Sequence, residues 1–391
     1  MNKGLNDVVI VGYGRSAVAK SGKHGALRRM HPVDLGGQIL RGVLDKIPAL
    51  KDSDIDDVIV GCAQQELSQS FNIGRLVAQR AGLPDSVSGM SCNRFCSSGL
   101  QSVALAAASI HAGFADVIAA GGVESMSSIP INYDNMKKSI NPWIWSNKPA
   151  NYAAMGITAE NVAKKYGVTR LEMEAFTVSS HTKAAAAQEA GRLAPSIIPL
   201  TGTDDEGKEI VFSQDQGIRK NTSMESLANL EPCFKKDGLV TAGTSSPTSD
   251  GAGFVILMSE EKAKELNISP IAKFTGFSVA GLDPAYMGLG PIYAVPKVME
   301  ETGLTADDMD VIELNEAFAV QSLMCIRKLG LNPDRVNPNG GALALGHPLG
   351  ATGAILICKA LDELQRIHGT YSLITMCIGG GMGAAGILQL I

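Results

Sequence analysis

The chain lacks several features that would assign it to a specialised class of protein. Its seven cysteines are odd in number and irregularly spaced, so they do not form the paired framework of a small secreted domain. No two cysteines have the C-x-x-C spacing of a zinc-binding pair. We therefore expect no structural metal, and we expect free thiols in a reducing compartment such as the cytoplasm.

Long apolar runs and an excess of positive charge are also missing. The longest apolar segments fall short of the roughly 18 residues that a membrane-spanning helix needs, and Met1–Asp7 lacks the character of a secretory signal. A net charge of −5 provides no general basic surface. We therefore expect no membrane and no nucleic-acid partner, and an anionic ligand would have to be received by local lysine or arginine side chains.

The sequence does have the composition of a well-packed α/β protein. It has 391 residues, 45% of them hydrophobic and 19% charged, which is too long for one ordinary core and predicts two domains. In the first part of the chain, the apolar segments Val8–Val11, Asp57–Gly61 and Asp116–Ala120 alternate with helical patterns. Continuously apolar strands are typical of a parallel or mixed sheet that helices cover on both faces.

A long segment of different character, residues 123 to about 244, interrupts this pattern. It begins with Met126–Asn151, which is rich in Ser, Asn, Pro, Met and Trp, and helices are then expected at Thr158–Tyr166, Arg170–Gly191 and Ser223–Leu230. Long loops inside a compact domain are usually functional. We interpret this segment as an insertion that carries binding surface.

From about Pro270 the sequence resumes in what looks like a second copy of the first part. An apolar strand is expected at Asp310–Leu314, a helix from Pro348 to about Ile367, and a pair of strands on either side of Gly379–Gly381. Both parts contain an apolar strand, a turn with reactive side chains, an Ala-rich helix and a Gly-rich return. The pattern therefore predicts a duplicated α/β fold.

Cys96 is the first candidate catalytic residue. It lies in Asn93–Gln101, where an apolar segment turns into an Ala-rich helical run, Val103–His111. The positive end of that helix would favour thiolate over thiol, and Ser97 and Ser98 are candidate caps for its first turn. The alternative is a buried, inert cysteine, which is the commoner state of an intracellular cysteine.

Three further candidates lie far down the chain. His347 precedes Pro348, which we expect at the first helical position, so that the positive helix end would keep the imidazole neutral. Cys377 is followed by Gly379–Gly381, whose N–H groups could form an oxyanion hole, although a tight turn between strands is the simpler interpretation. Asn315 could simply cap its helix. Together with Cys96, these groups suit acyl transfer through a thioester.

Four motifs, in this order, make the sequence resemble the thiolases over essentially its whole length. They are Asn93–Gln101, Asn315–Phe318, Gly340–Gly350 and Cys377–Gly383. The resemblance implies duplicated α/β domains that form a layered αβαβα core, with an N-terminal domain at 1–268, an inserted loop domain at about 123–244 and a C-terminal domain at 269–391. It also implies a homodimer or a homotetramer, the latter made through the inserted region.

The same resemblance implies a reaction and a role for each candidate. The protein would cleave 3-ketoacyl-CoA with CoA to acetyl-CoA and a shortened acyl-CoA, or would run the reverse condensation of acetyl-CoA. Cys96 would carry the acyl group and Cys377 would act as acid and base. His347 would activate Cys96 and, with a water held by Asn315, bind the thioester oxygen, whereas the N–H groups of Cys96 and Gly379 would form a second oxyanion hole. CoA is a substrate here, and no cofactor is implied.

Further residues match positions that line the CoA cleft in thiolases. They are Met155, Arg219, Ser226, Phe234, Ala242, Ser246 and Met287. Arg219 could receive the adenine or phosphate end of CoA, although a surface arginine is more often only solvated. Ala154 stands where short-chain acetoacetyl-CoA thiolases commonly have His. The smaller residue favours a degradative thiolase over a short-chain biosynthetic one, although one such change shifts discrimination by only about 1–3 kcal/mol.

Other functions predict different features at these positions. A ketoacyl synthase would have His or Asn in place of Cys377. A non-catalytic CoA-binding protein on the same fold would lack at least one reactive group, and none is missing from the four motifs. A redox protein that pairs Cys96 with Cys377 would form a reversible disulfide and would not turn over acyl-CoA.

Overall fold

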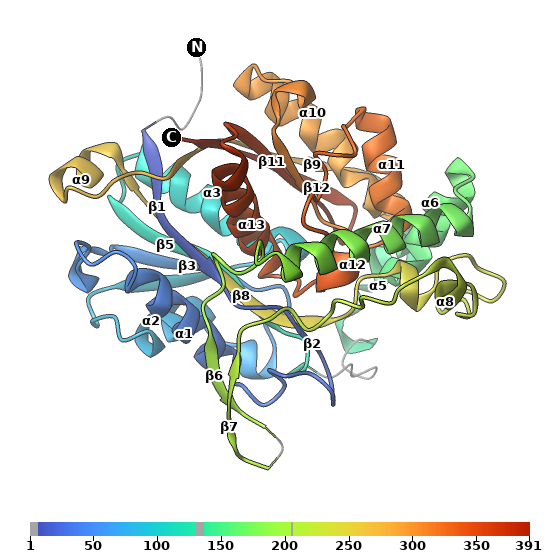
Figure 1. Cartoon of the computed structure of the whole chain (residues 1–391), viewed down its shortest axis with the longest axis horizontal. Coiled ribbons are helices and arrows are strands. Elements are labelled where there is room, and N and C mark those ends of the chain that lie inside the picture. Colours follow the sequence, from blue (N-terminus) through green and yellow to red (C-terminus); the bar gives the residue numbers. More distant parts are fainter. Residues whose placement is uncertain (1–6, 130–136, 205) are drawn as a thin grey trace.

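The computed structural model describes residues 7–129, 137–204 and 206–391. The expectations for the first six residues, and for residues 130–136 of the inserted segment, lie outside this part of the chain. The described strands form one mixed ten-stranded sheet and a separate two-stranded sheet in the insertion (Figure 1).

The elements follow the order that the sequence predicts. The first half contains β1 (Val8–Arg15), β2 (Ala19–Lys20), α1 (Pro32–Leu44), β3 (Asp57–Gly61), α2 (Ile73–Arg80), β4 (Ser88–Cys92), α3 (Ser98–His111), β5 (Val117–Ser125), β8 (Ser249–Ser259) and α9 (Glu260–Glu265). The insertion between β5 and β8 contains α5 (Pro142–Asn147), α6 (Met155–Tyr166), α7 (Arg170–Glu189), β6 (Leu200–Thr203), β7 (Glu209–Phe212) and α8 (Met224–Ala228). The second half contains β9 (Ala272–Gly281), α10 (Gly290–Thr302), β10 (Val311–Leu314), α11 (Ala319–Leu329), α12 (Ala342–Leu345), α13 (Thr352–Ile367), β11 (Tyr371–Ile378) and β12 (Met382–Leu390).

The two halves repeat one strand arrangement. In the first half, β3 pairs in parallel with β4 and β5, and β8 then pairs antiparallel with both β5 and β1. In the second half, β10 pairs in parallel with β11, followed by antiparallel β12 and β9. A parallel bridge from Ile312 to Val336 takes the place of β4. A short antiparallel pairing of β1 with β9 joins the halves, so the predicted duplication is confirmed.

Alternating residues of the strands face different helices, which produces five layers. Val9 and Val11 pack in the cluster of α1 and α2 on one outer face, whereas Val8 and Ile10 face the central helices. The central helices α3 and α13 pack against each other and against both halves of the sheet. Helices α10 and α11 cover the outer face of the second half (Figure 1). This arrangement is the layered αβαβα core that the sequence resemblance implies.

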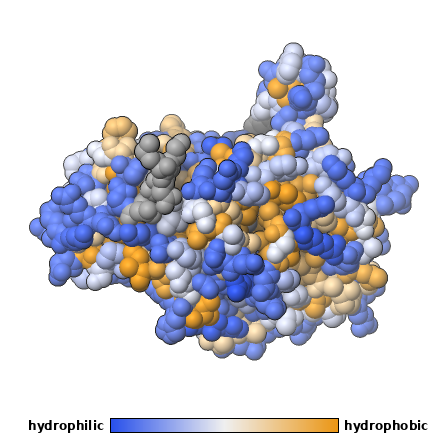
Figure 2. All heavy atoms as spheres, turned by 90° about the horizontal axis from the view of Figure 1, so that it is seen from above, coloured by the Kyte–Doolittle hydropathy of each residue, from blue (hydrophilic) through white to orange (hydrophobic). Residues whose placement is uncertain are grey.

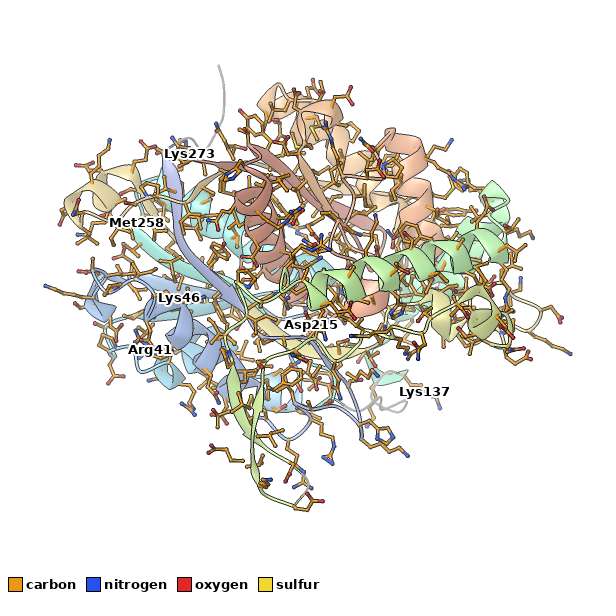
Figure 3. The ribbon with its side chains drawn as sticks, in the orientation of Figure 1. Arg41, Lys46, Lys137, Asp215, Met258 and Lys273 are labelled. Carbon is orange, nitrogen blue, oxygen red and sulfur yellow. The ribbon has the colours of Figure 1, made fainter. Side chains whose placement is uncertain are left out.

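A buried ion pair anchors the insertion to the first strand. Both side chains, Arg15 on β1 and Asp215 after β7, are completely buried. The guanidinium donates to the two carboxylate oxygens at 2.8 and 3.0 Å, and Asp215 also accepts the N–H of Val18. Asp215 is labelled in Figure 3. Because loss of one partner would leave an unpaired buried charge, this contact holds the chain path after the small sheet against the core.

Several element boundaries differ from the predictions, and two of them bear on the site. Strand β5 does not close at the glycines after Ala120 but continues to Ser125, because Gly121 and Gly122 pair with Phe254 and Gly253 of β8. Helix α13 begins at Thr352 and not at Pro348. The loop around Gly350 occupies the intervening residues, because it packs into the first half of the molecule.

The surface is mixed in polarity. Figure 2 shows the molecule of Figure 1 seen from above. On this face, hydrophobic residues gather over a broad central area, and hydrophilic residues surround it. Within the described residues, no helix has the length and apolar character needed to cross a membrane.

Candidate active site

Cys96 lies in a single 3₁₀ turn, η3 (Phe95–Ser97), which leads directly into α3. The Asn93 side chain shapes this turn, since it accepts the N–H of Phe95 at 2.8 Å and donates to Ala63 O at 3.0 Å. Phe95 adopts a left-handed φ of 44°, which is uncommon outside glycine. The turn therefore holds the cysteine in a fixed position at the end of β4.

The expected caps of α3 are not formed. Helix α3 has no side-chain cap at its first turn. Ser98 instead closes the preceding turn, because its hydroxyl accepts the N–H of Arg94 at 2.9 Å and donates to Phe95 O at 2.7 Å. Ser97 donates to Arg94 O. Both serines thus stabilise the turn that carries Cys96, rather than the helix after it.

The Gly-rich turn between β11 and β12 meets the Cys96 turn. Gly380 and Gly381 have φ values of 80° and 79°, and a methyl group added to Gly381 would lie 2.4 Å from Leu282 O, so this tight turn requires glycine. The backbone N–H groups of Gly379 and of Cys96 itself lie near enough to the Cys96 sulfur to lower the pKa of its thiol. Cys377, at the end of β11, is near enough for the charges of the two thiols to oppose each other.

Both thiols rest in the protonated form. Burial raises the pKa of Cys96 to about 11, although the two N–H donors oppose the rise. Burial also raises the pKa of Cys377 well above its ordinary value. The expectation that the helix end would favour a Cys96 thiolate is therefore wrong, because the loss of hydration outweighs it. All seven cysteines are free.

His347 is buried in the loop between α12 and α13 and has a defined tautomer. The Thr352 hydroxyl donates to Pro348 O at 2.9 Å, so its oxygen accepts from Nδ1 of His347 at 2.7 Å. The unprotonated Nε2 faces Nδ2 of Asn315 at 3.3 Å. Burial lowers the pKa of His347 to about 4. The predicted neutral imidazole is thus present, but burial keeps it neutral, because α13 begins five residues later.

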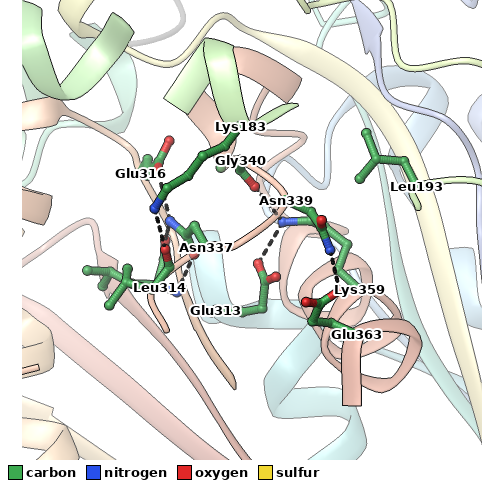
Figure 4. Close-up of polar contacts among 12 residues, drawn as sticks. Lys183, Leu193, Glu313, Leu314, Glu316, Asn337, Asn339, Gly340, Lys359 and Glu363 are labelled. Atoms are coloured by element: carbon green, nitrogen blue, oxygen red, sulfur yellow. Dashed lines mark hydrogen bonds and ion pairs between the residues drawn. The ribbon is translucent and has the colours of Figure 1, made fainter. Parts of the chain in front are cut away.

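Asn315 follows β10 and faces His347. It does not cap α11, whose N-cap residue is Phe318. Its Oδ1 atom is buried and lacks a hydrogen-bond partner in the described residues, which is unusual for a buried polar atom. The neighbouring Glu316 carboxylate accepts from Ser180, Asn337 and the Leu343 N–H. Figure 4 shows part of this network, which fixes the loop next to α7 and α12.

The positions expected to line the CoA cleft fall into two groups. Met155, Phe234 and Met287 belong to the apolar cluster that contains Cys377. The remaining four lie on the insertion and the segment after it. Arg219 donates its N–H to His181 Nδ1, Ser226 lies in the exposed first turn of α8, and Ala242 begins the 3₁₀ turn η5 (Ala242–Thr244). Ser246 borders the same apolar cluster, because it donates its N–H to Ala317 O.

Sequence reasoning missed two polar residues beside these loops. The sequence does not single out Thr352, because its role depends on which nitrogen of His347 carries the proton. The available signal is a threonine five residues after a histidine in a loop. Glu124 is fully buried at the end of β5. A glutamate that terminates an otherwise apolar strand was the available signal. In the described residues, no three His, Cys, Asp or Glu side chains are grouped as metal ligands.

Comparisons with known proteins agree with this geometry. A family model described as "Thiolase, N-terminal domain" matches residues 8–261, and one described as "Thiolase, C-terminal domain" matches residues 268–390. The 3-ketoacyl-CoA thiolase of Bacillus subtilis is 44% identical, over 99% of this chain and 100% of its own. The peroxisomal 3-ketoacyl-CoA thiolase 2 of Arabidopsis thaliana is 43% identical, over 98% of this chain and 84% of its own.

A solved structure is similar over nearly the whole fold. The crystal structure of the Bacillus anthracis acetyl-CoA acetyltransferase has a TM-score of 0.91 at 38% sequence identity, and the match covers 98% of this chain and 99% of the other.

Proposed function

The chain belongs to the thiolase family of acyltransferases, and from this premise we propose that it is a degradative 3-ketoacyl-CoA thiolase that works through a Cys96 acyl-enzyme. The observation that carries the proposal is the meeting of two turns from different halves of the molecule. There, the backbone N–H of Gly379 lies near enough to the Cys96 sulfur to lower the pKa of its thiol, and Cys377 is near enough for the charges of the two thiols to oppose each other. A nucleophile, an acid/base and fixed N–H donors are the parts that thioester chemistry needs.

In the first half-reaction, the Cys96 sulfur attacks the 3-keto carbon of the substrate. A sulfur–carbon bond forms, the bond between C2 and C3 breaks, and the electron pair of that bond passes to the acetyl-CoA enolate. Cys377 gives its proton to C2 of the enolate, so acetyl-CoA leaves and the shortened acyl group stays on Cys96 as a thioester. The high pKa of Cys377 suits this step, because the thiol holds its proton until a strong base forms.

In the second half-reaction, the Cys377 thiolate takes the proton of an incoming CoA thiol. The CoA sulfur attacks the thioester carbonyl, the bond to Cys96 breaks, and shortened acyl-CoA leaves. Cys377 is again a thiol, and Cys96 recovers its proton. In the condensation direction the same residue is the base that removes a proton from acetyl-CoA.

His347 would accept the Cys96 proton during attack. With Nδ1 bound to Thr352, Nε2 carries the lone pair. In the resting site this lone pair accepts from Nδ2 of Asn315 at 3.3 Å, so Asn315 would have to release it as the proton arrives. Because the pKa of Cys96 is raised and that of His347 is lowered, the proton stays on sulfur in the resting enzyme and moves only as the new bond forms. The protonated Nε2 then donates to the thioester oxygen. The unpartnered Oδ1 of Asn315 provides an acceptor for the water that would complete this oxyanion hole.

The CoA site is proposed along the cluster of Met155, Phe234 and Met287, which contains Cys377. These apolar side chains suit the pantetheine arm, and Arg219 would meet the adenine or phosphate end, with Ser226, Ala242 and Ser246 along the path. A reducing compartment keeps thiols free, and we keep the cytoplasm as the proposed location.

Thiolysis of 3-ketoacyl-CoAs of increasing acyl length tests the proposed substrate class. Ala154 immediately precedes Met155, whose sulfur would lie 3.6 Å from a methyl group added to Gly379. We expect kcat/KM to be sustained or to rise beyond acetoacetyl-CoA. The Ala154→His variant should lose about 10-fold in kcat/KM for long substrates relative to acetoacetyl-CoA, because the proposed acyl site lies beside Met155 and a larger ring next to it would reduce the space there.

The control for this series is Ala154→Ser, which keeps a small side chain and should keep the wild-type length profile. If Ala154→His shows the wild-type profile, Ala154 does not set chain length. If the wild type cleaves only acetoacetyl-CoA, the degradative assignment fails while the thioester mechanism stands.

A homodimer is proposed through the edge strand β4. This strand ends the large sheet and pairs only with β3 among the described strands, so one row of its backbone groups is unpaired. Exposed apolar side chains lie along the same edge, in the loop after β3, on α2, on β4 and in η3: Leu67, Phe71, Leu76, Met90 and Phe95. An exposed edge with such a patch fits a second copy of this chain.

Phe71→Asp should convert the dimer into a monomer. The Phe71 ring is 91% exposed, and a carboxylate there would have to be buried without a partner in the interface. Light scattering after gel filtration would measure the change. Phe114, which is 86% exposed after α3, provides the matched control, because Phe114→Asp should leave the mass unchanged. A wild-type monomer, or a dimeric Phe71→Asp variant, would refute this interface.

A further inference from the structure

We propose that Glu124 is a positioning residue that locks the His347 loop of the second half against the Cys96 turn of the first. The proposal rests on the proposed thiolase site. It adds to that site a residue that forms no hydrogen bond with the sulfur of Cys96 or of Cys377. It stands on three observations: the donors around the carboxylate, the close packing of the loop it holds, and its connection to Cys96.

The Glu124 carboxylate is fully buried and receives only donors. Oε2 accepts the N–H groups of Ala63 at 2.8 Å and of Gly350 at 2.7 Å. Oε1 accepts the N–H of Gln64 at 3.2 Å, Nε2 of Gln69 at 2.7 Å, and a weak contact from the Cys62 thiol at 3.8 Å. A carboxylate oxygen is the natural acceptor for so many donors, whereas a protonated carboxyl would bring a hydrogen of its own against them.

Hydrogen-bond donors, and not a cation, surround this carboxylate among the described residues. In the described part of the chain, no lysine, arginine or histidine side chain forms an ion pair with Glu124, unlike Glu313, which pairs with Lys359. Burial raises the pKa of Glu124, and the hydrogen bonds from Ala63, Gln69, Gly350 and Gln64 lower it. A buried carboxylate that depends on backbone donors is sensitive to the placement of every loop that provides one.

The loop that Glu124 holds is wedged into the first half of the molecule. A methyl group added to Gly122 would lie 2.1 Å from Gly350 O, and one added to Gly99 would lie 2.7 Å from the same atom. A methyl group on Gly350 would lie 2.7 Å from the Cys62 Cα atom and 2.8 Å from Glu124 Oε2. Because glycines lie on both contacting segments, their backbones can approach closely. The Glu124–Gly350 hydrogen bond then fixes how far the Gly350 loop reaches into the first half of the molecule.

A short chain of contacts joins Glu124 to both catalytic turns. On one side, the N–H of Ala63 donates to Glu124, and the Ala63 carbonyl oxygen accepts from Nδ2 of Asn93, the residue that shapes the Cys96 turn. On the other side, Gly350 lies three residues after His347. Displacement of the loop would therefore move the imidazole relative to the sulfur, and errors of about 1 Å in such a site can cost about 100-fold in rate.

The charge of Glu124 also acts on Cys96. The carboxylate is among the groups that raise the pKa of the Cys96 thiol. The Cys377 thiol also interacts with the charge of that sulfur, and the proposed mechanism adds His347 as the acceptor of its proton. Removal of the Glu124 charge should therefore make Cys96 more acidic even as it weakens catalysis. A residue that serves only to stabilise the fold would not produce these two opposite effects.

Glu124→Gln tests the inference with two readouts. The amide keeps the size of the side chain but places an NH2 group against backbone donors, so we expect kcat for thiolysis to fall by about 100-fold with little change in the KM for CoA. The rate of Cys96 alkylation by iodoacetamide at pH 7.5, read by peptide mass spectrometry, should rise severalfold, because loss of the negative charge favours the Cys96 thiolate. Unchanged kcat, or a lower kcat with an unchanged alkylation rate, would overturn the inference.

Two further variants keep the test decisive. Glu124→Asp retains the charge but withdraws the oxygens from Gly350, so kcat should fall while the alkylation rate stays at the wild-type value; a wild-type kcat would overturn the inference even if Glu124→Gln fails to fold. Asp362→Asn removes another buried carboxylate, which binds Ser196 and Tyr13, and should change neither readout. Activity in a Cys96→Ala variant would instead refute the proposed function itself.

Discussion

Cys96→Ala should lower the rate of thiolysis by on the order of 10⁵-fold or more, because loss of the proposed nucleophile removes the covalent route itself. The residual site would keep the N–H donors of Gly379 and residue 96, but without sulfur it has no atom to hold the acyl group. The measurement is the rate of 3-ketoacyl-CoA consumption with saturating CoA, in parallel with circular dichroism to verify folding.

Cys92→Ala is the matched control for this substitution. Cys92 is a partly buried thiol only four positions away, at the end of β4, and its sulfur contacts Ser98 O at 3.6 Å. Its removal should leave turnover within a few-fold of the wild type. Substantial activity in Cys96→Ala, or an equal loss in Cys92→Ala, would mean that the nucleophile has been misassigned.

Cys377→Ala should slow thiolysis and condensation alike, by about 10³-fold, which is within the usual range for the loss of a general acid/base. In the proposed mechanism the same thiol protonates the enolate in one direction and deprotonates acetyl-CoA in the other, so microscopic reversibility requires both rates to fall. The two rates are measured with 3-ketoacyl-CoA plus CoA and with acetyl-CoA alone.

Alkylation of Cys96 separates this effect from misfolding. In Cys377→Ala, the Cys96 turn and its Gly379 donor should remain in place, so iodoacetamide should still label Cys96. A variant that loses only one direction of the reaction would contradict the shared role of Cys377, and loss of Cys96 labelling would show a structural collapse instead.

Local sequence patterns predicted the architecture well, because the spacing of apolar residues and the backbone freedom of glycine determine structure among neighbouring residues. The apolar runs of β3 and β5 are buried as expected, and the predicted glycine turn between the last two strands is present, with left-handed φ values at Gly380 and Gly381. The duplication was visible as repeated elements. It is confirmed by the matching strand order of the two halves.

The predictions that were wrong concern features that depend on contacts between segments far apart in the sequence. The start of α13 could not be placed from Pro348, because the close approach of Gly350 to Gly99 and Gly122 shapes that loop. The protonation of Cys96 could not be read from its place before a helix, because burial by the facing turn raises its pKa to about 11. Glu124 was missed for the same reason, since its Gly350 partner lies 226 positions away.

The most direct test of the account is to look for the acyl-enzyme. The protein is mixed with one equivalent of a 3-ketoacyl-CoA in the absence of free CoA, quenched with acid, and digested for peptide mass spectrometry. The account predicts a mass increase equal to the shortened acyl group on the peptide that contains Cys96, and its removal when CoA is added before the quench. An acyl group found on Cys377 or on another residue, or turnover without any acylated Cys96 peptide, would contradict it.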